Sequence, residues 1–360
     1  MRTAVLYLGF GEPEEPTPDA VIPFLERIFA QNAPLEAPAT ADERARRARE
    51  LAERRAPGLI EDYERIGGSP LGAQARGQAD ALRRRLAERG HVVDVRVAMQ
   101  YVDPLIPDVV AGLQEGGIER LIGLPVYPLC GWSTNVAALA EMREAVEALG
   151  WDVEVHEVNG WHSHPVYVQV WADAIERTAS EDGLDLRAPD TELYFSAHGT
   201  PIKYLEAGSR YDLYVEEFCR ETARRLGVDS YALGYQNHAN RGVRWTQPDN
   251  EERIREVAAN HVVVAPISFM HEQSETLAEL DIDFREEAEG LGLAFHRVPV
   301  PNSDPRFADV LADLVVPFIE GRGAAEAGFA PCLCRRAPGA VCLNATRAFP
   351  RRAAPAPVAG

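Results

Sequence analysis

Two periods of hydrophobic and polar residues alternate along the chain. Short apolar runs such as residues 3–10 (TAVLYLGF) and 261–269 (HVVVAPISF) are typical of buried strands. Between the runs, apolar residues recur every three or four positions, which is typical of amphipathic helices. Further strands are predicted over residues 92–101, 120–128, 151–158, 192–199, 230–236 and 293–300. Helices are predicted over residues 21–29, 41–54, 69–90, 106–115, 133–150, 166–178, 211–226, 251–259 and 305–318, with a further acidic helix after residue 269.

The alternation of strands and helices predicts an α/β fold with parallel sheets and crossover helices. Residues 151–158 begin a second series, so we expect two doubly wound, Rossmann-like domains with a cleft between them. We place the first domain at residues 1–155 and the second at 156–320. Residues 321–360 form an Ala/Pro/Gly/Arg-rich tail without periodicity, which we expect to be partly disordered unless something organises it.

Charge and composition exclude several classes of partner. The 360 residues are 46% hydrophobic and carry a formal net charge of −19, which argues against nucleic acid as a partner because its binding proteins need a basic surface. The N-terminus does not resemble a signal peptide, and no apolar run approaches the ~18 residues of a membrane span. We therefore expect a cytoplasmic protein whose five cysteines are not a disulfide framework.

Carboxylates are concentrated in the segment after the strand at 261–269. On an α-helix four of them share one face, while four apolar residues share the opposite face. The carboxylates are Glu275, Glu279, Asp283 and Glu286, and the apolar residues are Leu277, Leu280, Phe284 and Leu291. Two interpretations stay open: an ordinary solvated face, or a row of oxygen ligands for a divalent cation.

A histidine ends another predicted strand, in the sequence SAHGTP. Ligands bind beyond the carboxyl ends of parallel strands, so His198 is well placed to be a ligand or general base. With the carboxylates and the aromatic residues Phe10, Tyr235 and Trp245, it indicates a flat ligand, a hard cation and proton transfer. A nucleotide-sugar or amide hydrolase would share much of this pattern.

Four longer motifs carry a family resemblance. RIGGSPL at 65–71, FSAHGTP at 195–201, PISF followed by ETLAELDIDF within 266–284, and VPNSDPRFADVLADLV at 300–315 match in kind, order and spacing. Over roughly residues 3–320 the chain resembles ferrochelatases, the enzymes that insert ferrous iron into a porphyrin to give heme or coproheme.

The resemblance implies roles for particular residues. His198 would bind Fe²⁺ or accept a pyrrole proton, Glu275 would face it across the crevice, and Glu279 and Asp283 would continue an acidic route for metal or protons. Family members often have a histidine where this chain has Gln273. The residues expected to touch the porphyrin ring or its propionates are Phe10, Tyr127, Trp245, Arg65 and Arg241.

The tail contains three cysteines within eleven residues, Cys332, Cys334 and Cys342. Some ferrochelatases hold a two-iron, two-sulfur (2Fe-2S) cluster on three C-terminal cysteines and a distant fourth, for which Cys130 is the candidate. Zinc or free thiols are the alternatives, and Cys219 is expected to be a small buried hydrophobe.

Two other functions stay open at this point. A cobalt chelatase of cobalamin synthesis would share the fold, and a tetrapyrrole or metal carrier would bind without catalysis. The sequence does not distinguish protoporphyrin from coproporphyrin, and it leaves open the oligomeric state. The resemblance also implies a lip over the cleft, within the first domain at about residues 17–65. Its apolar residues predict either peripheral contact with a membrane or closure over the substrate.

Overall fold

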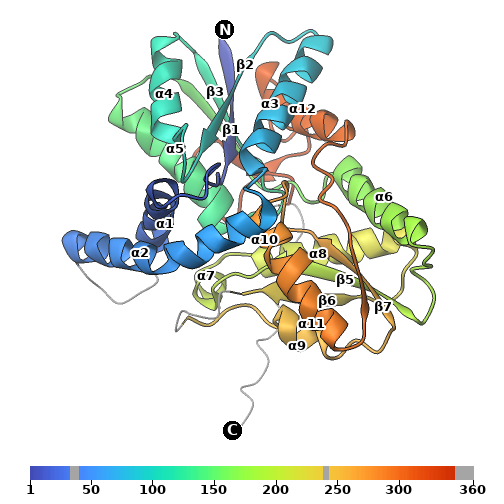
Figure 1. Cartoon of the computed structure of the whole chain (residues 1–360). Coiled ribbons are helices and arrows are strands. Elements are labelled where there is room, and N and C mark those ends of the chain that lie inside the picture. Colours follow the sequence, from blue (N-terminus) through green and yellow to red (C-terminus); the bar gives the residue numbers. More distant parts are fainter. Residues whose placement is uncertain (33–39, 238–242, 345–360) are drawn as a thin grey trace.

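The computed structural model describes residues 1–32, 40–237 and 243–344. Within these residues the strands form two sheets, one of six strands and one of four, with helices on both faces of each (Figure 1). Every pairing is parallel except that of β9 with β10. This confirms the predicted α/β class.

The first sheet has the strand order β2-β1-β3-β4-β10-β9. Its bounds are β1 (Thr3–Gly9), β2 (Asp94–Met99), β3 (Arg120–Pro125), β4 (Glu154–Val158), β9 (Ala330–Pro331) and β10 (Ala340–Cys342). Successive residues of β1 face opposite sides. Val5 and Tyr7 pack in the core that contains residues of α3 (Leu71–Glu88) and α12 (Arg306–Ile319). The alternate residues of β1 pack on the other face, against α4 (Ile106–Glu115) and α5 (Ala137–Ala148).

The second sheet has the order β6-β5-β7-β8. Its bounds are β5 (Thr191–His198), β6 (Ala232–Gln236), β7 (His261–Pro266) and β8 (Ala294–Arg297). The helices α6 (Pro165–Glu181) and α8 (Tyr211–Leu226) cover one face. The other face packs against α9 (Asn250–Ile254), the π-helix η3 (Glu279–Phe284) and α11 (Arg285–Gly290).

Two elements cross the expected domain limits. The strand β4, expected to open the second series, instead pairs with β3 and extends the first sheet. The helix α12, expected in the second domain, packs beside α3 on the first sheet. There Asp309 of α12 forms an ion pair with Arg89 at 2.8 Å. That residues 1–155 and 156–320 fold as two separate units therefore stays a prediction.

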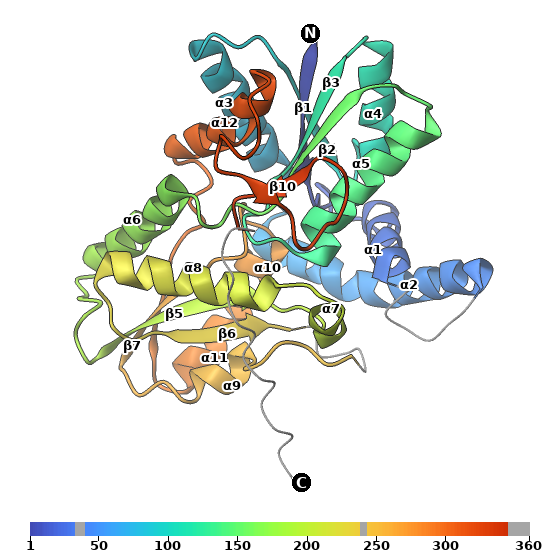
Figure 2. The ribbon, with the colours of Figure 1, turned by 180° about the vertical axis from the view of Figure 1, so that it is seen from behind.

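The described part of the tail, residues 321–344, packs against the first half of the structure. Its strand β10 pairs with β4 and extends the first sheet (Figure 2). The carboxylate of Glu157, which is fully buried, explains this attachment, because Arg143 from α5 and Arg335 from the tail both pair with it. The amino-acid pattern of the tail did not predict its pairing with β4.

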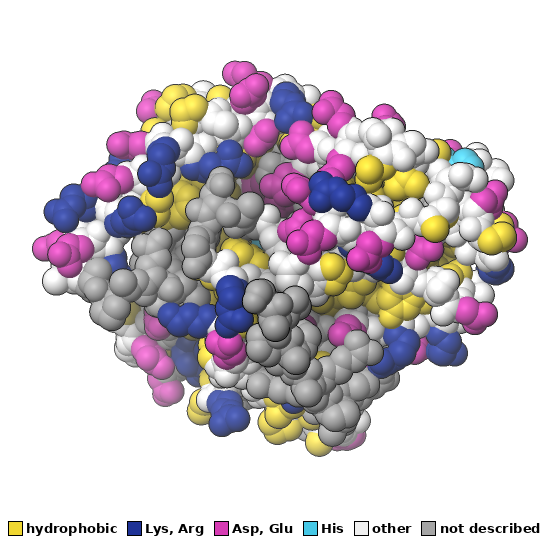
Figure 3. All heavy atoms as spheres, turned by 90° about the horizontal axis from the view of Figure 1, so that it is seen from below, with side chains coloured by type: hydrophobic (Ala, Val, Ile, Leu, Met, Phe, Trp, Pro, Cys, Tyr) yellow, Lys and Arg dark blue, Asp and Glu magenta, His cyan; other side chains and the backbone are white. Residues whose placement is uncertain are grey.

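The helices α1 (Pro18–Asn32) and α2 (Ala41–Ile66) project beside the junction of the two sheets (Figure 1). α2 begins at a capping box formed by Thr40 and Glu43, and it ends at Gly67, whose φ of 77° is left-handed. It therefore runs twelve residues beyond the predicted end at residue 54. Viewed from below, the surface mixes acidic and basic side chains (Figure 3). Among the described helices, none is long and apolar enough to cross a membrane.

Three short helices complete the described elements. They are η2 (Trp132–Val136), α7 (Ile202–Glu206) and α10 (Ser274–Leu277).

Candidate active site

The acidic segment is divided into three pieces rather than forming one α-helix: α10, then η3, then α11. In η3 the amide of Asp283 donates to the carbonyl of Ala278 at 3.0 Å, five residues back, which is the π-helical pattern. The wider turn rotates later residues away from the face that a 100° spacing predicts. Leu280 and Phe284 are buried as expected, but Leu291 is 47% exposed, so its predicted place in the core is wrong.

His198 is fixed at the end of β5 by its backbone and by one ring nitrogen. Its amide donates to Ser268 Oγ at 2.9 Å, and Tyr211 donates to its carbonyl at 3.0 Å. Nδ1 lies 2.6 Å from the carbonyl of Gly199, so Nδ1–H donates there and Nε2 is directed elsewhere. A Cβ on Gly199 would lie 1.8 Å from the side chain of Asn237, so only glycine fits this turn.

His198 Nε2 lies 3.1 Å from Glu275 Oε1. A porphyrin ring does not fit in this gap, so the two side chains line the same side of any ring site and do not face each other across it. Burial disfavours protonation of the imidazole, but the charge and hydrogen bond of Glu275 outweigh it and raise the pKa of His198 to about 9. His198 therefore carries a proton at neutral pH.

The carboxylate of Glu275 has a second partner. Gln273 donates from Nε2 to Glu275 Oε2 at 2.6 Å, so both oxygens are held. The neighbouring Glu279 accepts from Gln236 Nε2 at 3.2 Å. Burial, and then the charge of Glu275, raise the pKa of Glu279 to about 8, so this carboxyl is mainly neutral at pH 7.

Asp283 and Arg65, predicted to have separate roles, lie together. Arg65 donates to Asp283 at 2.8 Å and to Asp62 at 3.3 Å. The pair joins α2 of the lip to η3, and about half of the Asp283 side chain is exposed. A ligand that binds Asp283 Oδ1 or Arg65 Nη2 must therefore break this pair.

The predicted aromatic residues are distributed between the two halves. The ring of Trp245 lies 6.4 Å from that of His198, edge to face, and Phe269, which the sequence analysis missed, lies at the same distance. Phe10 packs against Tyr101 with ring centroids 4.6 Å apart. Tyr127 donates to Gln100 at 3.3 Å.

One further predicted aromatic residue does not contribute to the described site. Tyr235 is buried in the core at 4% exposure. Arg241 lies outside the described residues.

His271 lies two residues before Gln273 in the same segment. Its Nε2 lies 2.9 Å from Tyr7 Oη and 3.0 Å from Gln78 Oε1. Burial lowers the pKa of His271 to about 3, so the ring is neutral and serves as a structural link between the halves. The sequence analysis also missed Glu12, a buried carboxylate directly after β1 and close to this link.

The four predicted cluster cysteines lie together and are buried. Hydrogen bonds from Cys130, Cys334 and Cys342 lower the pKa of Cys332. In the described part of the chain, no group of three or more His, Cys, Asp or Glu side chains is arranged to hold a metal ion. Cys219 is fully buried in the core, as expected.

Buried amides beside these sulfurs fit an iron–sulfur cluster. Asn344 donates from its backbone to Cys342 Sγ at 3.1 Å. Its side-chain nitrogen and that of Asn159 are buried without a hydrogen-bond partner among the described residues. A Cβ on Gly160 would lie 2.4 Å from the Asn344 nitrogen and 2.8 Å from Cys130 Cβ. Cluster sulfur atoms accept hydrogen bonds from such donors.

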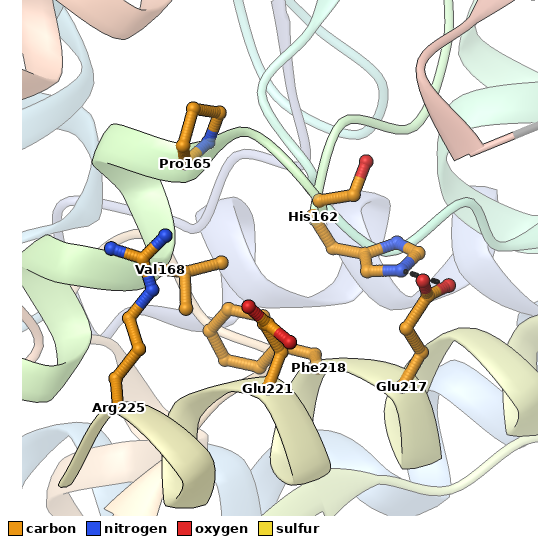
Figure 4. Close-up of a pocket in the computed structure, with 8 residues that line it drawn as sticks. His162, Pro165, Val168, Glu217, Phe218, Glu221 and Arg225 are labelled. Atoms are coloured by element: carbon orange, nitrogen blue, oxygen red, sulfur yellow. Dashed lines mark hydrogen bonds and ion pairs between the residues drawn. The ribbon is translucent and has the colours of Figure 1, made fainter.

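A separate cavity of ≈ 280 Å³ lies between α6 and α8 (Figure 4). At its wall His162 Nε2 lies 3.0 Å from Glu217 Oε2, with both side chains buried. Glu221 and Arg225 also line it. Its volume falls just below the ~300–1,000 Å³ of sites for drug-sized ligands, so it does not fit a porphyrin.

A family model and two curated relatives indicate the same family for this chain. The family model for ferrochelatase matches residues 2–317. The chain is 34% identical over 320 residues to the ferrochelatase of Geotalea uraniireducens (strain Rf4), covering 87% of this chain and 97% of that one. It is 37% identical over 339 residues to the ferrochelatase of Synechococcus sp. (strain JA-2-3B'a(2-13)), covering 92% and 96%.

A solved structure of SirB from Bacillus subtilis with Fe³⁺ has a similar fold. The TM-score is 0.55 at 8% identity, covering 91% of this chain and 98% of that chain. At this identity the similarity concerns the fold alone.

Proposed function

The chain belongs to the ferrochelatase family, and from that premise we propose that His198 and Glu275 are its catalytic pair. It is an enzyme that inserts ferrous iron into a porphyrin in heme biosynthesis. The observation that supports the pair is the 3.1 Å contact between His198 Nε2 and Glu275 Oε1 at the carboxyl end of β5.

The reaction requires both pyrrole N–H protons to leave as Fe²⁺ enters. A planar ring hides its nitrogen lone pairs, so the enzyme must hold the ring distorted, with the strain offset by contacts elsewhere on the macrocycle. His198 is protonated at rest and Glu275 shares that proton, so the pair must release a proton before it accepts one from a pyrrole or binds the metal. Glu279 interacts electrostatically with both members of the pair and, with a pKa of about 8, can take up this proton once it has released its own.

Iron reaches the pair along the acidic segment in this proposal. Asp283 is the exposed outer carboxylate, and Glu279 lies between it and Glu275 in the sequence. Fe²⁺ prefers oxygen and imidazole ligands, which this route provides. Because the Arg65 guanidinium is hydrogen-bonded to Asp283 Oδ1, a cation that binds this oxygen must replace the guanidinium.

The porphyrin contacts its site through aromatic rings and cations. Trp245 forms a wall beside His198, Phe10 and Tyr127 pack against the ring from the first half, and Arg65 binds a propionate as a planar fork. Exchange of Arg65 from Asp283 to a propionate would couple porphyrin binding to the opening of the metal route. Protoporphyrin and coproporphyrin remain the two candidate substrates, and assaying both side by side distinguishes them.

The four buried cysteines hold a 2Fe-2S cluster in this proposal. Four thiolates are the ligands that such a cluster needs, and the unpartnered amides of Asn159 and Asn344 supply hydrogen bonds to its sulfur. A cluster would also explain why the tail stays attached to the first sheet. Zinc and free thiols are the other outcomes of the test, which is visible absorbance with iron and sulfide analysis of protein purified without oxygen.

The location of the enzyme and its folding units are part of the same proposal. We place it in the cytoplasm, with peripheral membrane contact through α1 and α2 as a further possibility to test by vesicle sedimentation. Residues 1–155 and 156–320 are proposed as the two folding units.

The experiment that tests the function is iron-dependent loss of free-porphyrin fluorescence, with His198→Ala as the inactive comparison.

A further inference from the structure

The buried carboxylate of Glu12 joins the two halves next to the catalytic pair. Glu12 follows β1 and is 4% exposed. Its Oε1 accepts from Ser274 Oγ at 2.5 Å, and its Oε2 accepts from Ser69 Oγ at 2.5 Å and from the backbone amide of Ser274 at 3.2 Å. Ser274 directly precedes Glu275, so this contact acts on the backbone that carries the catalytic carboxylate.

A carboxylate in this position is costly to bury. Burial raises the pKa of Glu12, the hydrogen bonds from Ser274 and Ser69 oppose the rise, and the charge of Glu275 adds to it. Tyr63 of α2 also lies close enough for Glu12 to perturb it. A residue that only filled space here would be apolar, so the hydrogen bonds to Ser274 are the feature to explain.

The segment before Glu275 is tied to the first half at several positions. Gln78 donates to the carbonyl of Met270 at 3.1 Å, and the amide of Glu272 donates to Gln74 at 2.8 Å. His271 is held by Tyr7 and Gln78. Glu12 holds Ser274, the last of these positions before the catalytic residue.

We propose that Glu12 is a positioning residue that sets the place of Glu275, and through it the distance to His198. The first half thereby fixes a carboxylate that belongs to the second half, and the contact between Glu275 and His198 depends on this one side chain. This inference rests on the proposed function of the pair.

The test compares Glu12→Gln with Glu14→Gln. The second glutamate lies two residues away, is 62% exposed and pairs with Arg76 at 2.7 Å, so it is a matched control for charge and sequence position. An amide at position 12 has one acceptor oxygen in place of two and carries no charge, so the hydrogen bonds that hold Ser274 are weakened. A misplacement of about 1 Å costs up to ~100-fold in rate, so we expect kcat to fall ~10–100-fold while the KM for porphyrin changes less than about twofold.

Glu12→Asp keeps both acceptor oxygens and is expected to recover part of kcat. Thermal unfolding checks that each variant is folded. If Glu12→Gln does not fold, Ser274→Ala and Ser69→Ala each remove one donor, and the inference then requires a larger loss of kcat in Ser274→Ala.

Equal kcat in Glu12→Gln and Glu14→Gln would overturn the inference, as would equal effects of the two serine variants. The wild type and His198→Ala are measured in the same assay. If His198→Ala is inactive and Glu12→Gln is normal, only this inference fails. If His198→Ala is active, the proposed function of the pair fails.

Discussion

Gln273 donates a 2.6 Å hydrogen bond to Glu275 Oε2, the oxygen that does not contact His198. A neutral donor thus holds the second oxygen of this carboxylate. It orients the carboxylate without adding a group that titrates near neutral pH. The imidazole of His271, two residues earlier, is neutral because burial lowers its pKa to about 3. In the proposed mechanism His198 is therefore the histidine that takes part in proton transfer.

Gln273→Leu should weaken catalysis more than it weakens folding. Loss of a hydrogen bond to a charged group costs about 1.5–3 kcal/mol, so we expect kcat to fall ~10–100-fold as Glu275 loses its orientation. The measurement is steady-state kinetics with thermal unfolding alongside. Gln169→Leu, which removes a glutamine between α6 and α8, is the control and should keep kcat near the wild-type value. Equal kcat in the two variants would contradict the role of Gln273.

Several features of this site were predictable because they follow from local pattern. His198 lies at a strand end, and Glu275 and Glu279 share the segment after another strand, so parallel pairing of β5 with β7 brings them together. The π-turn in η3 was not predictable, because one extra residue per turn leaves no mark on a sequence scored at 100° per residue. The pairing of Asp283 with Arg65 was also missed, since it depends on how α2 packs against the second half.

The first sheet shows the same limit. Residues 3–10 and 92–101 were recognised from their apolar runs, and they form neighbouring parallel strands. The attachment of the tail depends on the buried Glu157 and on arginines from two distant segments, so nothing local to the tail predicts it. Glu12 looked like an ordinary charged residue after a strand, because its partners come from 57 and 262 residues away.

Asp283→Asn should affect the metal more than the porphyrin. Removing the outer carboxylate weakens capture of Fe²⁺, so we expect the KM for iron to rise several-fold while kcat at saturating iron changes little. The side chain is about half exposed, so the unfolding temperature should stay close to that of the wild type. Glu286→Gln, an exposed carboxylate of the same segment, is the control. An unchanged KM for iron would argue against the metal route.

Glu279→Gln should change how stability depends on pH. The folded-state pKa of about 8 lies above the ordinary glutamate value of 4.5, so the folded wild type binds the proton more tightly than the unfolded chain does. Wild-type stability from this group is fully present below pH ~4.5 and is lost as pH rises toward 8.

The glutamine variant cannot ionise, so its unfolding temperature relative to wild type should rise between pH 5 and 8 and then level off. Each kcal/mol corresponds to about 2–4 °C for domains of this size. Differential scanning calorimetry across this range gives the measurement. A difference in unfolding temperature that does not vary with pH would show that Glu279 is not held neutral.

Cys332→Ser should remove the cluster if one is present. Cys332 accepts hydrogen bonds from the other three thiols, so its replacement removes the ligand that contacts all the others. We expect loss of visible absorbance and of bound iron and sulfide in protein purified without oxygen. Cys219→Ser is the control; it should lower stability because a buried apolar contact is lost, yet retain the colour. A colourless wild type free of iron and sulfide would reject the cluster.

The most direct test of the central claim is the rate of iron insertion in His198→Ala. Porphyrin fluorescence is followed as Fe²⁺ is added, with binding of the porphyrin measured separately in the absence of metal. Positioned proton transfer contributes ~10²–10⁴-fold to a rate, so the variant should bind porphyrin yet insert iron at least ~100-fold more slowly than the wild type. A folded His198→Ala that inserts iron within a few-fold of the wild-type rate would show that the pair with Glu275 is not the catalytic site.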